Sequence, residues 1–104
     1  MKSVQEKINS LIGKDVLVRS YASGVHIGKI EAYDMATRII ILNDARRLWQ
    51  WTGAFTLSAV ARNGVEDAKI STSLPFHIVM QVEEIIPLEE KIVIKFNNIE
   101  DHKI

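Results

Sequence analysis

Residues 15–30 read DVLVRSYASGVHIGKI, and the spacing of their apolar side chains decides the fold class. Val16 and Val18 alternate with Leu17 and Arg19, which is typical of a β-strand because successive side chains point to opposite faces. Small and polar residues follow and favour a turn, after which apolar positions continue into a second strand. The pattern predicts two antiparallel strands, at 15–19 and 25–30, joined by a turn at 20–24.

The flanking segments extend this pair into a small meander. Residues 38–42 predict a third, β-branched strand that a short connection joins to the second. Gly28, inside the second strand, indicates a β-bulge or a close approach of two backbones. On the N-terminal side, Ser3 and Glu6 make a capping box before an apolar stripe, so we expect a helix that ends at Gly13.

The second half of the chain predicts one short helix and more strands. Thr56 is the expected N-cap of a helix that the pair Asn63 and Gly64 ends. Residues 89–96 fit both a helical and an alternating pattern, and we assign them to a strand because their apolar side chains recur at every second position. Further strands are expected at 69–72, 76–82 and 84–86, and the polar tail 97–104 is expected to fray.

These elements predict a mainly β chain of the α+β class. We expect a small antiparallel sheet or barrel-like domain with an N-terminal helix and one short mid-chain helix. A chain of 104 residues has room for one hydrophobic core, so we expect residues 1–104 to form a single domain. Its parts are the N-terminal helix 1–13, a β-rich core 15–96 and the tail 97–104.

Composition narrows the classes of function. The chain has 13 basic and 13 acidic side chains and no cysteine, which excludes disulfides and thiolate chemistry. A net charge of zero argues against binding driven by bulk charge, so we expect nucleic acid to be an unlikely partner. The apolar runs are too short to cross a bilayer and the first residues do not resemble a signal peptide. We therefore expect a cytoplasmic protein without a membrane partner.

Few residues could carry catalysis. The three histidines, His26, His77 and His102, lack metal-ligand spacing, and no nucleophile elbow, P-loop or dinucleotide fingerprint is present. His26 and His77 lie within expected strands, where we expect solvent-facing or edge positions rather than catalytic ones. The sequence thus predicts a protein that is not an enzyme and that holds no metal or cofactor.

The segment 43–55 differs from the rest because it gathers arginine and tryptophan. An arginine offers a planar fork of donors suited to phosphate, and a tryptophan offers a face on which a base can stack. Side chains two apart share a face of a strand, so Trp49 and Trp51 can form one platform, whereas adjacent arginines cannot both lie on it. The candidate ligand-binding residues are Arg46, Arg47, Trp49, Trp51 and Phe55. Alternatively, both tryptophans pack in the small core and the arginines are solvated or form ion pairs.

Three runs of the sequence resemble a family of small bacteriophage proteins of unknown function. Residues 16–29 resemble the opening of that family, residues 43–57 its signature, written ARRLWxWxGAxxL, and residues 82–87 its V-x-E-I-x-P strand. The signature also loosely resembles the first Thoeris anti-defence proteins, which are oligomeric sponges for cyclic ADP-ribose-type immune signals. This resemblance implies a non-enzymatic homo-oligomer in the host cytoplasm that binds a small phosphorylated nucleotide.

Two functions follow as hypotheses. In the first, the protein sequesters a cyclic nucleotide or cyclic ADP-ribose-type signal and thereby inhibits bacterial anti-phage defence. In the second, it is a structural or assembly module of a phage whose tryptophans bury a subunit interface and which has no small-molecule ligand.

Overall fold

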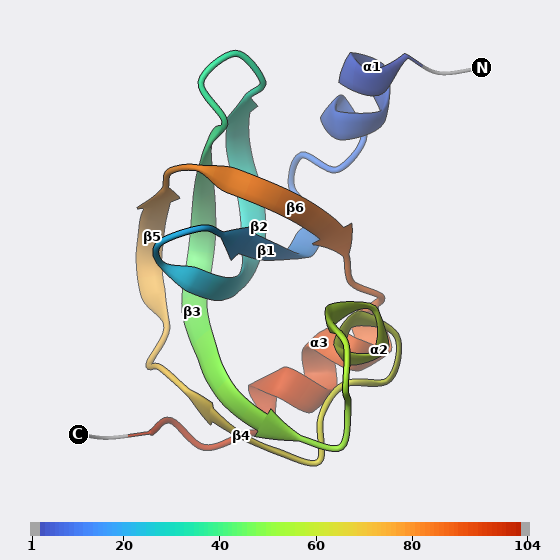
Figure 1. Ribbon diagram of the computed structural model, residues 1–104, viewed down its shortest axis with the longest axis vertical. Coiled ribbons are helices and arrows are strands. Elements are labelled where there is room, and N and C mark those ends of the chain that lie inside the picture. Colours follow the sequence, from blue (N-terminus) through green and yellow to red (C-terminus); the bar gives the residue numbers. More distant parts are fainter. Residues whose placement is uncertain (1–2, 103–104) are drawn as a thin grey trace.

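The structure is a computed structural model that describes residues 3–102 (Figure 1). Its elements follow the order α1 (Val4–Asn9), β1 (Asp15–Ser20), β2 (Gly24–Asp34), β3 (Ile39–Thr52), α2 (Leu57–Asn63), β4 (Asp67–Ile70), β5 (Leu74–Val79), β6 (Val82–Pro87) and α3 (Glu90–Asn97). Within this part of the chain, no helix is both long enough and apolar enough to span a membrane.

The strands form one antiparallel sheet in the order β4-β3-β2-β1-β6, and β5 also pairs with β3. β3 is long enough to carry two partners, β5 along its first half and β4 along its second half. In Figure 1, β1 and β6 run across β2 and β3, which gives the sheet a strongly curved shape. The prediction of a mainly β, antiparallel domain with an N-terminal helix and a short mid-chain helix is therefore confirmed.

Irregular positions in β2 and β3 allow this curvature. The β2–β3 register shifts between Ile27 and Lys29, at the glycine for which a bulge was predicted. A Cβ atom at Gly28 would lie 2.9 Å from the carbonyl oxygen of Asn43, so only a glycine lets the two backbones approach this closely. Asp44 follows with a φ of 51°, a left-handed conformation within β3.

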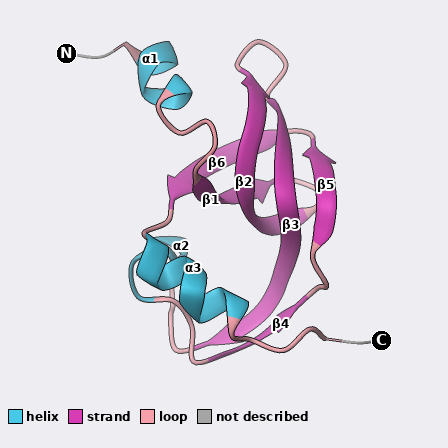
Figure 2. Cartoon of the chain, turned by 180° about the vertical axis from the view of Figure 1, so that it is seen from behind, coloured by secondary structure: helices cyan, strands magenta, loops and turns pink. Residues whose placement is uncertain are grey.

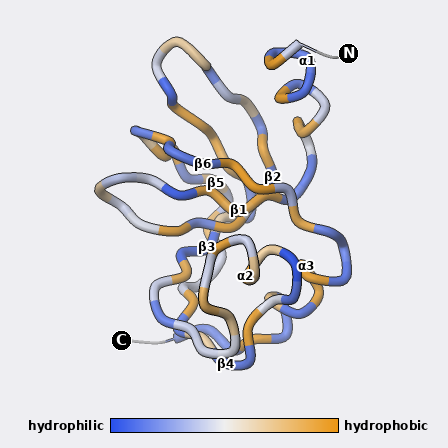
Figure 3. The backbone as a smooth tube through the Cα atoms, turned by 45° about the vertical axis from the view of Figure 1, so that its right-hand side comes forward, coloured by the Kyte–Doolittle hydropathy of each residue, from blue (hydrophilic) through white to orange (hydrophobic). Residues whose placement is uncertain are grey.

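The sheet has apolar side chains on both of its sides. One buried cluster consists of Val16, Val18, Ile30, Ile40, Leu42, Ala45, Val79 and Val82. The other consists of Leu17, Val25, Ile27, Leu48, Val60, Ile70, Ile92 and Phe96. Figure 2 shows α2 and α3 together at one end of the sheet and α1 at the opposite end, and the second cluster includes residues of α2 and α3. Hydrophobic segments of β1 and β6 lie side by side in Figure 3, in agreement with their pairing.

The predicted N-caps of the first two helices are confirmed, whereas the prediction that the first helix ends at Gly13 was wrong, because α1 ends at Asn9. Ser3 Oγ accepts a hydrogen bond of 3.1 Å from the backbone N–H of Glu6, and Thr56 Oγ1 accepts one of 3.1 Å from Ala59. Gly64 ends α2 with a φ of 76°, and its N–H donates to the carbonyl of Val60. Local hydrogen bonding thus fixes where both helices begin.

The assignment of residues 89–96 to a strand was wrong, because this segment forms α3. Ile92 and Phe96 are four residues apart and are both buried against the second cluster, whereas Ile94 is half exposed. An i, i+4 pair lies on one face of a helix, and the sheet offers an apolar surface for that face. Packing on the rest of the chain decided between two patterns that fit the sequence equally well.

The prediction that the tail frays was also wrong for residues 97–102, while residues 103 and 104 lie outside the described part. The guanidinium of Arg46 is buried and donates to the carbonyls of Ser71, Phe96 and Ile99 at 2.9, 3.0 and 3.2 Å. It also forms an ion pair of 2.6 Å with Asp101. These four contacts fasten the β4–β5 link, the end of α3 and the tail to β3.

This contact predicts a large effect of Arg46 on stability. We expect Arg46→Ala to lower the free energy of unfolding by about 3 kcal/mol, because it leaves one buried and two partly buried carbonyls and the carboxylate of Asp101 without their donor. Arg46→Lys keeps the positive charge but lacks the planar fork of donors, so it should lower the free energy of unfolding by less than Arg46→Ala does. Urea unfolding measures both values. Arg38→Ala is the control, because Arg38 forms an exposed ion pair of 3.9 Å with Glu83 and its loss should cost less than about 1 kcal/mol. Equal effects of Arg46→Ala and the control would contradict this role.

Candidate functional site

An open groove of about 970 Å³ lies beside β3, where the chain passes from β4 to β5. The β1–β2 turn, β3, the β4–β5 link, β5 and the tail all contribute to it. Its lining residues are Ala22, Ser23, Gly24, Ala45, Arg47, Trp49, Ser71, Thr72, Leu74, His77, Asp101 and His102.

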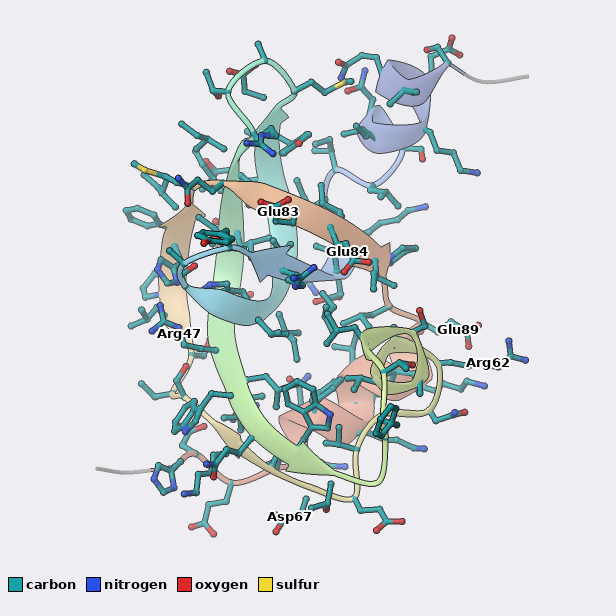
Figure 4. All side chains as sticks on the ribbon, in the orientation of Figure 1. Arg47, Arg62, Asp67, Glu83, Glu84 and Glu89 are labelled. Atoms are coloured by element: carbon teal, nitrogen blue, oxygen red, sulfur yellow. The ribbon has the colours of Figure 1, made fainter. Side chains whose placement is uncertain are left out.

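Arg47 is the arginine among the described residues that line the groove. Its backbone is fixed, because its N–H donates to Ser71 Oγ at 2.8 Å and its carbonyl accepts from Ser71 N–H at 2.9 Å. Its guanidinium is exposed and has no hydrogen bond or ion pair with any residue from 3 to 102. Figure 4 shows Arg47 on the β5 side of β3, well separated from Glu84 and Glu89.

Trp49 is the aromatic residue that accompanies Arg47. It lies two residues further along β3, and 37% of its surface is exposed. The ring of His102 stands edge-on to its indole, with ring centroids 5.4 Å apart and an interplanar angle of 79°. A cation donor and an aromatic face thus line the same groove, an arrangement suited to a phosphate attached to a flat ring.

The other predicted residues lie elsewhere. Arg46 faces the interior and holds the tail, so its guanidinium is not available to a ligand in the groove. Trp51 packs against the second core cluster and donates its indole N–H to the carbonyl of Ala54 at 3.1 Å. Phe55 is 99% exposed and lines neither the groove nor the neighbouring depression.

The predicted platform of two tryptophans is only partly formed. The β3–β4 register shifts between Leu48 and Gln50, so regular alternation is interrupted between the two indoles. Trp49 and Trp51 both border a second depression, of about 710 Å³. Only Trp49 lines the groove that contains Arg47.

A polar pair of one groove-lining and one buried side chain lies at the β1–β2 turn. His26 is completely buried, and its Nε2 atom lies 2.9 Å from Ser23 Oγ. The ring of His77 stands edge-on to it, with centroids 5.0 Å apart. Burial, followed by the charge of Arg47 and the neighbouring His77, lowers the pKa of His26 from 6.5 to about 4, so this imidazole is neutral at pH 7.

Sequence analysis missed Ser23 and the roles of the histidines. The expectation of a solvent-facing or edge position was wrong for His26, which lies in β2 between β1 and β3, whereas His77 does lie on the edge strand β5. Ser23 and His26 are three residues apart across a turn, and this spacing was the available signal. Among residues 3–102, no group of three or more metal-ligating side chains is placed to hold an ion.

Comparison with known proteins places the chain in a family. Residues 13–96 match the family described as a domain of unknown function (DUF6948), and the chain belongs to that family. A comparison with curated proteins matches none of them.

Comparison with solved structures identifies the fold. Three solved chains match. One is an Sm protein of Pyrococcus abyssii in complex with a uridine heptamer, with a TM-score of 0.55, 19% sequence identity, and coverage of 83% of this chain and 99% of that chain. The chain is therefore a domain of unknown function with an Sm-like fold.

This likeness corrects the expectation that nucleic acid is an unlikely partner. A protein of similar fold holds a uridine heptamer, so a balanced net charge gives no reason to exclude nucleic acid. The physical reason is that stacking faces and a few well-placed cations act locally, while net charge averages over the whole surface.

The buried imidazole predicts a specific pH dependence of stability. Because the pKa of His26 is 6.5 in the unfolded chain and about 4 in the folded one, the unfolded chain takes up the proton first as pH falls. Protonation of His26 in the unfolded chain should therefore lower the free energy of unfolding by about 3 kcal/mol as the pH falls from 7 to 4. Urea unfolding of wild type and His26→Gln across this range measures the difference, and carboxylates common to both proteins cancel. Parallel pH curves would contradict the prediction.

Proposed function

We propose that this chain is a non-enzymatic binding protein whose groove captures a phosphorylated, base-containing ligand. The observation that carries the proposal is the placement of Arg47 and Trp49 on one wall of an open groove. The guanidinium binds phosphate oxygens, and the exposed face of the indole stacks on the base. The volume of about 970 Å³ suits a nucleotide-sized molecule.

The ligand we favour is a cyclic nucleotide or a cyclic ADP-ribose-type signal. The run 43–57 resembles the signature of small phage proteins and, loosely, of Thoeris anti-defence sponges, and it contains both Arg47 and Trp49. One arginine with one indole suits a compact anion, and the carboxylate of Asp101, which lines the groove, is already paired with Arg46. In this proposal a phage protein sequesters the signal in the host cytoplasm and so inhibits bacterial anti-phage defence.

A second candidate is single-stranded RNA. The observation that favours it is the fold shared with an Sm protein in complex with a uridine heptamer. An aromatic face beside an arginine accepts a base of a single strand as well as that of a small nucleotide. The groove is open, so a strand can enter and leave it.

Titration calorimetry with three kinds of ligand tests the proposal: cyclic dinucleotides and trinucleotides, cyclic ADP-ribose isomers, and a uridine heptamer. Arg47→Ala and Trp49→Ala should each weaken the binding of whichever ligand is captured by about 1–3 kcal/mol, which is roughly 5-fold to 150-fold in affinity. Arg62→Ala and Phe55→Ala are matched controls, because both side chains are exposed outside the groove. Absence of heat with all three kinds of ligand would overturn the proposal.

We also propose that the protein is a homo-oligomer. β5 is an edge strand, and its side chains Leu74, Phe76 and Ile78, followed by Met80, are all 46–62% exposed. An edge strand with a row of exposed apolar side chains is a surface that a second copy can cover. The alternative function, a phage assembly module without a ligand, also needs a subunit interface, and in that hypothesis Trp49 and Trp51 are buried in it.

Phe76→Glu separates assembly from ligand binding. A buried carboxylate is costly, so this substitution should shift the protein toward monomers in analytical ultracentrifugation. Arg47→Ala should leave the oligomer intact and weaken ligand binding. A wild-type protein that sediments as a monomer at every concentration would rule out the oligomer, and oligomers that bind none of the tested ligands would favour the assembly module.

A further inference from the structure

The groove contains a second polar feature besides Arg47. Ser23, in the β1–β2 turn, lines the groove, and its Oγ lies 2.9 Å from Nε2 of His26 in β2. His26 is the register partner of Arg47 in β3, so cross-strand pairing places both side chains on the same face of the sheet. The turn and β3 therefore contribute Ser23 and Arg47 to the lining of the groove, and His26, next to the groove, contacts Ser23 and pairs with Arg47.

The surroundings of His26 determine which nitrogen carries its proton. The ring is completely buried, and its Nδ1 atom has no hydrogen-bond partner among residues 3–102. A proton on Nδ1 would create a buried donor without an acceptor. A proton on Nε2 instead donates to Ser23 Oγ and leaves a lone pair on Nδ1, which costs less because a buried unpaired acceptor is better tolerated than a buried unpaired donor.

This tautomer sets the direction of the serine hydroxyl. When Nε2–H donates to Ser23 Oγ, one lone pair of that oxygen is occupied and the hydroxyl hydrogen is free to donate elsewhere. Ser23 is half-buried and lines the groove, so an acceptor inside the groove can receive that hydrogen bond. His26 thus acts through Ser23, as a positioning residue.

We propose that Ser23 and Arg47 together form a phosphate subsite in the groove and that His26 fixes Ser23 as its hydroxyl donor. A phosphate group offers only acceptors to such a site, and two donors of different kinds, a hydroxyl and a guanidinium, match two of its oxygens. This inference rests on the proposed function and deepens it, because it assigns the phosphate to the Ser23 side of the groove and the base to the Trp49 side.

The charges around the pair support this assignment. Burial, followed by the nearby charges of Arg47 and His77, lowers the pKa of His26 to about 4, so the imidazole stays neutral and keeps its single proton between pH 6 and pH 8. Asp101, the carboxylate among the described lining residues, lies 2.6 Å from Arg46, which offsets its charge. An anion in the groove therefore meets Arg47 without a competing unpaired carboxylate.

The first experiment determines the tautomer without any ligand. The ¹⁵N chemical shifts of the His26 ring distinguish a protonated Nε2 from a protonated Nδ1. We expect the proton on Nε2 throughout pH 6–8. A proton on Nδ1 would overturn the role of His26, because Nε2 would then accept the serine hydroxyl hydrogen and leave Ser23 no donor for the groove.

The second experiment measures the affinity for inorganic phosphate at constant ionic strength by NMR titration. We expect Ser23→Ala to weaken phosphate binding about tenfold and Ser23→Thr to retain it, because threonine keeps the hydroxyl. His26→Leu should weaken phosphate binding by a similar factor. His26→Gln should retain phosphate binding, because the glutamine amide N–H can donate to Ser23 Oγ. If a substitution at the buried His26 impairs folding, the Ser23 variants still test the subsite, because Ser23 is only half-buried.

A uridine titration separates this inference from the proposed function. If nucleotides bind through Arg47 and Trp49 while Ser23→Ala keeps wild-type affinity for phosphate, the subsite is wrong and the proposed function stands. If phosphate binds and responds to Ser23→Ala while neither uridine nor any nucleotide binds more tightly than phosphate, the subsite stands and base capture is wrong. No phosphate binding to the wild type overturns the subsite.

Discussion

The position of the groove depends on the buried guanidinium of Arg46. From β3 it holds the β4–β5 link through Ser71, the end of α3 through Phe96, and the tail through Ile99 and Asp101. Because the link and the tail form walls of the groove, one interior side chain fixes the walls relative to β3. Four contacts from one rigid, planar group also explain why an arginine, rather than a lysine, occupies this position.

Adjacent arginines serve opposite purposes here because a strand alternates its side chains. Arg46 points inward and builds the groove, while Arg47 points outward and supplies its charge. His102, carried by the tail that Arg46 holds, stands edge-on to Trp49 and supports the aromatic wall. The chemistry of the open groove is thus coupled to a structural contact on the other side of the same strand.

Patterns between close neighbours predicted most of the fold. Alternation at residues 15–30, the caps at Ser3 and Thr56, and the bulge at Gly28 depend on a few adjacent residues, and all of them were predicted. Residues 89–96 satisfy both a helical and an alternating pattern, and only their packing on the sheet selects the helix. The prediction for the tail was also wrong because its position depends on a distant contact: its partner Arg46 is more than fifty residues away in the sequence.

The candidate site was predicted in part for related reasons. The unusual composition of residues 43–55 identified Arg47 and Trp49. Alternation showed that the two arginines could not share a face but not which of them faced inward. The contributions of His77 and His102 arise from segments that only the folded sheet brings together, so no local pattern indicates them, whereas Ser23 had a local signal in its three-residue spacing from His26.

Mapping of a bound nucleotide by NMR tests the central claim most directly. Backbone and side-chain shifts of the protein should be recorded during titration with each ligand that calorimetry identifies. The account predicts that the largest changes occur at Arg47 Nε–H, Trp49 Nε1–H and the residues of the β1–β2 turn, with little change around α1. Changes centred on α1 and β6, or on Trp51 without Arg47, would contradict it.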